Sequence, residues 1–244
     1  MTNHYLSPLF TPRSVAIVGA TERDGALGRF VWENMRAANF QGTLYAVNPK
    51  HRQLFGNPCY ARLSALPTVP DLIVITAPAE AVLEILRDAG QCGIKAAVVL
   101  SAGFAEIGPE GRALAESVKA ELSRTGIRMI GPNCLGIMRP AIGLNATFAN
   151  VAGRPGSLAL VSQSGAVCTA ILDWAATTEI GFSSLISLGG AIDLDFGEVL
   201  DYLVHDPETR GILLYIEGIR DARRFLSSLR AAARVKPVIV LKAG

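Results

Sequence analysis

Short runs of apolar and β-branched residues alternate along the chain with longer stretches in which apolar positions repeat at helical spacing. In the first half the predicted strands are residues 14–18, 43–47, 72–76, 96–100 and 128–130, and the predicted helices between them are 27–38, 79–91 and 109–125. Pro109 suits the first turn of the last helix, and Gly126 ends it. Strands that alternate with helices predict a parallel sheet covered by helices.

Glycine and proline interrupt this pattern between Gly131 and Gly156, and the alternation then begins again. The predicted strands of the second half are 157–161, 182–187, 211–216 and 238–241, with helices beginning near Gly165, Phe196 and Ala222. We therefore expect two α/β domains, one over 8–149 and one over 150–244. Because the last strand ends just before residue 244, the second domain is expected to continue beyond this chain.

The composition predicts a globular protein without a strong electrostatic preference for one class of partner. Of the 244 residues 50% are hydrophobic and 18% are charged, with a formal net charge of +2. The longest apolar runs fall far short of the roughly 20 residues of a membrane-spanning helix. The first residues lack the basic start and apolar stretch of a secretory signal. We expect a cytoplasmic protein that binds neither nucleic acid nor membrane.

The four cysteines do not have the spacing of a metal site. Cys59, Cys92, Cys134 and Cys168 are far apart in the sequence, and none belongs to a C-x-x-C pair. We expect free, buried thiols and no metal.

Small residues follow the first predicted strand, in the position where an open parallel sheet binds ligands. The loop runs from Gly19 through Ala20 and Thr21 to Gly25 and leads into a helix. Backbone N–H groups and the helix dipole favour a phosphate at such a place. The glycine spacing fits neither G-x-G-x-x-G nor G-x-x-x-x-G-K-[ST]. The loop therefore favours neither an NAD-binding site nor a P-loop ATP site. A tight turn without a ligand is the alternative.

The other strand ends of the first half are also rich in small residues and proline. Lys50 follows Asn48 and Pro49 and is the cation best placed to meet a nucleotide phosphate, although a solvated surface lysine is the alternative. The remaining candidates at these ends are Thr76, Ala77, Pro78, Ser101 and Asn133.

In the second half, Ser162, Ser164 and Gly165 end a strand and open a helix. Hydroxyl groups and unpaired N–H groups at a helix start predict an anion site. A serine nucleophile elbow is disfavoured, because its G-x-S-x-G pattern would need glycine at Ser162. Glu217 follows the strand 211–216, where an ordinary exposed acid is the alternative to a functional carboxylate.

Six of these segments, in this order, resemble the NDP-forming acyl-CoA synthetases, which are related to the succinyl-CoA synthetase α subunit. They are the loop at Gly19 and residues 47–50, 77–79, 101–104, 131–136 and 162–166. The resemblance covers essentially the whole chain. It implies a Rossmann-like CoA-binding domain followed by a truncated flavodoxin-like ligase domain.

The resemblance also implies roles for the candidate residues. The loop from Gly19 to Gly25 would hold the CoA phosphates, Lys50 would contact the nucleotide end, and Thr76, Ala77 and Pro78 would line the same groove. The full set implied for ligand binding is Gly19, Ala20, Thr21, Gly25, Lys50, Thr76, Ala77, Pro78, Ser101, Asn133, Ser162, Ser164 and Gly165. Glu217 would be the catalytic carboxylate that orients a phosphohistidine.

The implied reaction is an ADP-forming acid–CoA ligation through an acyl phosphate and a phosphohistidine. The histidine would lie on a loop after the last strand, and ATP, ADP and Mg²⁺ would bind an ATP-grasp module, so this chain alone is expected to be inactive. Thr169 stands where the succinate-specific enzymes have a tyrosine, which argues against succinate. The alternative is a regulatory CoA-binding region fused to a GNAT-type protein lysine acetyltransferase. An oligomer is compatible with either.

Overall fold

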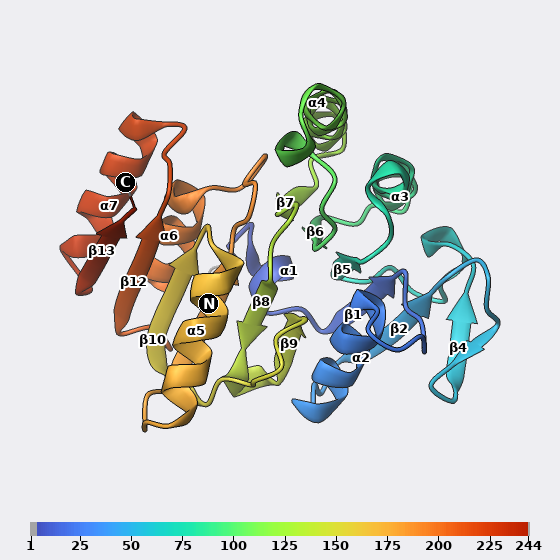
Figure 1. Ribbon diagram of the computed structural model, residues 1–244, viewed down its shortest axis with the longest axis horizontal. Helices are drawn as coiled ribbons and strands as arrows, with labels where there is room; N and C mark the ends of the chain where they lie inside the picture. Colours follow the sequence, from blue (N-terminus) through green and yellow to red (C-terminus); the bar gives the residue numbers. More distant parts are fainter. Residues whose placement is uncertain (1–3, 244) are drawn as a thin grey trace.

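The computed structural model describes residues 4–243 and contains two sheets that lie side by side, with helices between and around them (Figure 1). The first sheet has the strand order β3-β4-β2-β1-β5-β6-β7. Its strands are β1 (Ser14–Val18), β2 (Thr43–Val47), β3 (Gln53–Leu54), β4 (Asn57–Tyr60), β5 (Leu72–Ile75), β6 (Ala96–Val99) and β7 (Arg128–Ile130). All pairings are parallel except β3 with β4.

Both faces of the first sheet are covered, as the alternation of helices and strands predicts. Its helices are α1 (Ser7–Phe10), α2 (Leu27–Ala37), α3 (Ala79–Gln91) and α4 (Pro109–Thr125), with short 3₁₀ turns at Leu63–Ala65 and Ala105–Ile107. A third 3₁₀ turn, Pro140–Ile142, connects β8 and β9 of the second sheet. In β1, Val15 and Ile17 pack in the core that contains α1 and α2, whereas Ala16 and Val18 pack in the core that contains α3 and α4. A strand buried on both faces explains the continuous apolar run.

The second sheet has the order β13-β12-β10-β11-β8-β9. Its strands are β8 (Gly136–Arg139), β9 (Leu144–Thr147), β10 (Pro155–Ser162), β11 (Phe182–Ser187), β12 (Gly211–Ile216) and β13 (Val238–Lys242), and its helices are α5 (Gly165–Ala176), α6 (Phe196–His205) and α7 (Ala222–Ala233). Helix α5 covers one face, and α6 covers the other (Figure 1). The predicted fold class, two successive α/β units, is confirmed.

Two hairpin-like pairs were not predicted: β3 with β4, and β8 with β9. The second matters for the organisation of the chain, because β8 pairs antiparallel with β11 and so belongs to the second sheet. The chain therefore enters that sheet at Gly136, before the expected boundary near residue 150. Gly136 has φ +112°, and a Cβ there would lie 2.1 Å from the carbonyl oxygen of Ala146. Glycine is needed here because the two strands approach each other closely, and it does not interrupt the strand.

One core joins the two sheets. It contains Ile17 of β1, Leu144 of β9 and Phe196 of α6, all buried together. A buried ion pair lies at the same junction: Arg139 of β8 contacts both carboxylate oxygens of Asp206, at 2.9 and 3.0 Å. The two units are thus held against each other by packing and by paired charges.

In the part of the chain that the structure describes, no helix combines the length and apolar character that crossing a bilayer requires. Residues 4–243 also contain no group of three or more His, Cys, Asp or Glu side chains arranged to hold a metal ion. The four cysteines are free thiols.

Candidate functional site

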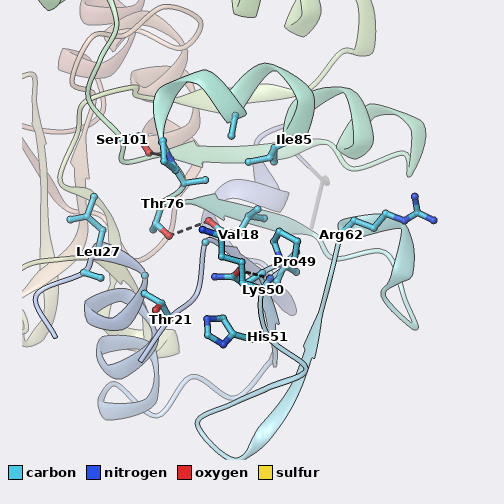
Figure 2. Close-up of a pocket in the computed structure, with 18 of the residues that line it drawn as sticks. Val18, Thr21, Leu27, Pro49, Lys50, His51, Arg62, Thr76, Ile85 and Ser101 are labelled. Carbon is cyan, nitrogen blue, oxygen red and sulfur yellow. Dashed lines mark hydrogen bonds between the residues drawn. The ribbon is translucent and has the colours of Figure 1, made fainter. Parts of the chain in front are cut away.

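A groove of about 1100 Å³ runs along the carboxyl ends of β1, β2, β5 and β6 (Figure 2). The chain leaves β1 toward β2 on one side and returns to β5 on the other, so the groove lies where the strand order reverses. This is the position at which open parallel sheets bind ligands. The prediction of a site at these strand ends agrees with the groove.

The first wall of the groove is the loop at Gly19, and it is packed too tightly for side chains. Gly19 has φ +97°, and a Cβ there would lie 2.8 Å from the backbone nitrogen of Ala77. A Cβ on Gly28, in the first turn of α2, would lie 2.2 Å from the carbonyl oxygen of Gly19. The start of α2 therefore rests directly on the loop, which only glycine permits.

Hydrogen bonds fix the same loop to the neighbouring strands. The hydroxyl of Thr76 donates to the carbonyl oxygen of Val18 at 3.1 Å (Figure 2). The side chain of Asn48 donates to the carbonyl oxygen of Ala20 at 2.9 Å. Ala26, the N-cap residue of α2, offers no side-chain cap to the helix. N–H groups of the first turn are thus left for a ligand or water to satisfy.

The groove has an excess of free positive charge. Arg23, Lys50 and Arg62 line it, and none of them forms an ion pair with another described residue. The two carboxylates of the lining are already occupied: Glu84 pairs with Arg87, and Asp88 accepts from the N–H groups of Leu63 and Ser64. Three cations against two carboxylates leave an excess of positive charge that favours an anionic ligand.

Eight of the predicted binding residues line this groove: Gly19, Thr21, Gly25, Lys50, Thr76, Ala77, Pro78 and Ser101. Ala20 does not line it, because its side chain is buried behind the loop. Arg23, His51 and Arg62 were not among the predicted binding residues, although all three line the groove. His51 lies beside Lys50, and Arg62 lies at the opposite end from Leu27 (Figure 2). Arg23 could have been predicted, because it is a cation within the loop between Gly19 and Gly25.

Three further predicted residues, Ser162, Ser164 and Gly165, lie together at a second place, the turn before α5. Ser162 is fully buried, and its hydroxyl donates to the carbonyl oxygen of Ser164 at 2.8 Å and accepts from the N–H of Ser164 at 3.0 Å. The hydroxyl of Ser164 caps α5 by accepting from the N–H of Val167. Both hydroxyls therefore have partners within the turn. Gly165 begins the helix, and its own N–H is not used by this cap.

Glu217 lies beside this turn. Its backbone N–H donates to the side-chain oxygen of Gln163 at 2.7 Å, and its carboxylate is exposed. Thr169 donates its hydroxyl to the carbonyl oxygen of Gly165 at 3.1 Å. The structure thus brings the end of β12 and the start of α5 together from distant parts of the sequence.

Asn133 connects the two places. Its N–H donates to the carbonyl oxygen of Ser101, at the edge of the groove, at 3.0 Å. Two residues later, the N–H of Leu135 donates to the hydroxyl of Ser187, and a Cβ on Gly165 would lie 3.6 Å from the Cβ of Leu135. The segment that includes Asn133 and Leu135 therefore runs from the groove to the start of α5.

Burial raises the pKa of Cys134 in this segment to about 12, and it raises the pKa of Cys168 in α5 to about 12 as well. Both thiols are therefore protonated near neutral pH, and a thiolate nucleophile is absent at these two positions.

Fold and groove together define a protein of two α/β units, the first with a ligand groove where its strand order reverses. Two family models match in the corresponding places: a CoA binding domain over residues 13–140, and a succinyl-CoA ligase like flavodoxin domain over residues 155–244. The chain belongs to the NDP-forming acetyl-CoA ligase family, and the resemblance seen in its sequence is confirmed.

Relatives with assigned activities cover nearly all of the chain. An acetate–CoA ligase [ADP-forming] I of Archaeoglobus fulgidus is 43% identical over 97% of the chain and 34% of the relative. An acetate–CoA ligase [ADP-forming] I subunit alpha of Pyrococcus furiosus is 36% identical over 98% of the chain and 53% of the relative. The chain therefore spans between a third and about half of these relatives.

A solved structure shows the same fold. The dinucleotide forming acetyl-coenzyme A synthetase 1 of Ca. Korarchaeum cryptofilum, in complex with phosphate and ADP, superposes with a TM-score of 0.94 at 36% identity. The match covers 98% of this chain and 52% of that chain.

Proposed function

We propose that this chain is the CoA-binding part of an ADP-forming acid–CoA ligase that works through an acyl phosphate and a phosphohistidine. The observation that carries the proposal is the groove. Glycines line it, it is open along the carboxyl ends of four strands, and its cationic side chains outnumber its carboxylates. CoA combines a phosphate cluster with a long thin arm, which suits such a groove better than a closed pocket. The relatives described above are ligases, which supports this function over the acetyltransferase alternative.

Within this proposal the two places have separate tasks. The first turn of α2 and the loop at Gly19 bind the CoA phosphates, and Lys50 contacts the phosphate at the nucleotide end. The arm then passes Ser101 and Asn133 toward the start of α5, where N–H groups of the helix stabilise a phosphoryl group. Glu217 accepts a hydrogen bond from the phosphorylated imidazole and orients it. None of these contacts selects a particular acyl group.

The histidine and the ATP-grasp module belong, in this proposal, to polypeptide outside the chain. Relatives two to three times as long leave room for both. This chain alone is therefore expected to bind CoA and to take no label from radioactive ATP. Mg²⁺ and ATP would act in the complete enzyme, and no step assigned to this chain passes through them.

The test is a calorimetric titration of this chain with CoA and with dephospho-CoA. A charge contact in a solvated groove is worth about 1–2 kcal/mol, so Lys50→Ala should weaken CoA roughly 5- to 30-fold. Dephospho-CoA should lose much less, because it lacks the 3′-phosphate. Lys95→Ala is the matched control, since Lys95 is exposed and lies outside the groove lining. Absence of CoA binding to the unmutated chain would contradict the proposal, and equal losses for both ligands would remove the role of Lys50.

A further inference from the structure

The side chain of Gln163 joins the turn before α5 to the end of β12. Its oxygen accepts from the N–H of Glu217 at 2.7 Å and from the N–H of Gly218 at 2.9 Å. Its nitrogen donates to the carbonyl oxygen of Gly218 at 2.9 Å. The backbone N–H of Gln163 also donates to the carbonyl oxygen of Tyr215 at 3.2 Å. One residue thus makes four hydrogen bonds to a segment that lies more than 50 positions away in the sequence.

These bonds hold the backbone on both sides of Glu217. The N–H of Glu217 belongs to the peptide group before its Cα, and the N–H of Gly218 belongs to the peptide group after it. With both groups bound to one side chain, the direction of the Cα–Cβ bond, along which the side chain of Glu217 leaves the backbone, is fixed. An amide is required here, because it presents an acceptor and a donor in one plane.

Packing does not provide the same restraint. A Cβ on Gly218 would have no neighbour within 4 Å, and the side chain of Glu217 is exposed. The loop at Gly218 is therefore held by hydrogen bonds rather than by a tight fit. Without Gln163, the last residues of β12 would keep their ladder to β10 and β13, but the loop beyond them would lose its main anchor.

We propose that Gln163 is a positioning residue that directs the carboxylate of Glu217 toward the phosphorylated imidazole. The inference rests on the proposed function, in which Glu217 orients the histidine. In that step a nitrogen of the neutral imidazole forms a bond to phosphorus, the bond from phosphorus to the acyl oxygen breaks, and the carboxylate of the acid leaves. The other ring N–H stays hydrogen-bonded to Glu217. Gln163 exchanges no atom and acts only through Glu217.

The test uses the full-length protein and a single-turnover assay of phosphohistidine formation from an acyl phosphate. Gln163→Met keeps the length of the side chain and removes all three of its hydrogen bonds. We expect its phosphorylation rate to fall about 10- to 100-fold, the usual cost of losing an outer orienting contact. The Kd for CoA should not change, because the groove belongs to the other sheet. Gln91→Met, on the exposed end of α3, is the matched control.

The combined effect of two substitutions on the phosphorylation rate distinguishes a positioning role from a merely structural role. If Gln163 acts only through Glu217, the double variant Gln163→Met with Glu217→Gln should phosphorylate no more slowly than Glu217→Gln alone. Gln163→Glu keeps an acceptor for both N–H groups but places an oxygen against the carbonyl of Gly218. We expect an intermediate rate for it, and it provides a second variant if Gln163→Met folds poorly.

Each outcome decides the inference. A normal rate in Gln163→Met, or rates in the double variant that multiply the two single losses, would overturn the positioning role while leaving the proposed function intact. A full-length unmutated protein that binds CoA but never forms a phosphohistidine would overturn the proposed function and the positioning role with it.

Discussion

The buried ion pair between Arg139 and Asp206 makes a sharp test of how the two sheets are held together. Both side chains are almost fully buried, with 4% and 3% of their surface exposed. Arg139 also donates to the hydroxyl of Tyr202 at 2.6 Å and contacts the carbonyl oxygen of Phe10. The guanidinium thus reaches α1, α6 and the segment after α6 from a single position on β8. Asp206→Asn preserves the shape of the site and removes the charge that balances Arg139.

The expected loss follows from the burial. Removing one partner leaves an uncompensated charge away from water, which costs about 3–5 kcal/mol. For a chain of this size each kcal/mol lowers the Tm by roughly 2–4 °C, so Asp206→Asn should lower it by about 6–20 °C. Glu84→Gln is the matched control, because Glu84 is 72% exposed and its pair with Arg87 lies on the surface of α3. A surface pair contributes about 1 kcal/mol or less.

The assay is urea denaturation of the chain followed by circular dichroism, with the Tm measured in parallel. A double variant, Arg139→Met with Asp206→Leu, removes both charges and should recover much of the stability that the single variant loses. If Asp206→Asn shifted the midpoint no more than Glu84→Gln, the account of Arg139 as a charge that depends on its partner would be wrong.

Two further outcomes follow from close packing and from buried thiols. Gly28→Ala should weaken the affinity for CoA at least tenfold, because its Cβ would lie 2.2 Å from the carbonyl oxygen of Gly19. Gly93→Ala is the control, since Gly93 has φ +79° and open space around it. It should cost about 1–2 kcal/mol of stability and leave CoA binding unchanged. Cys134 and Cys168, with pKa values of about 12, should resist a thiol reagent at pH 8 until the chain unfolds. Because these values are raised above the unfolded value of roughly 8.5, the thiols' contribution to stability is complete below that pH and is lost as the pH rises toward 12, which urea titrations at several pH values would show.

The elements that the sequence predicts well are those with one unambiguous pattern of apolar residues. Strands β1, β5 and β6 are buried on both faces, so their apolar runs are continuous and their limits are close to those predicted. The groove was predictable for a related reason. Once the strands are parallel, their carboxyl ends meet at one edge, and the small residues after each strand must gather there.

Positions decided by contacts between distant segments were harder to predict. Strands β8 and β9 have four residues each, and Gly136 and Gly143 resemble punctuation when only their neighbours in sequence are considered. Their pairing depends on β11, which comes much later in the chain. Likewise, Gln163 belongs to a recognised motif, but its role depends on the end of β12. No local pattern records that contact.

The turn before α5 shows how the same residues serve folding and, by our proposal, phosphate binding. Because the hydroxyl of Ser164 caps the helix, Ser164→Ala should cost about 1 kcal/mol of stability but leave the N–H groups near Gly165 free for an anion. Ser164→Asp keeps the cap and suits the helix dipole, so stability should hold, while its carboxylate should repel a phosphoryl group. The Tm of each variant, measured in phosphate and in chloride of equal ionic strength, separates these effects. We expect the phosphate-dependent rise in Tm to persist in Ser164→Ala and to vanish in Ser164→Asp. Loss of the phosphate-dependent rise in Ser164→Ala would mean that the hydroxyl, rather than the helix N–H groups, binds the anion.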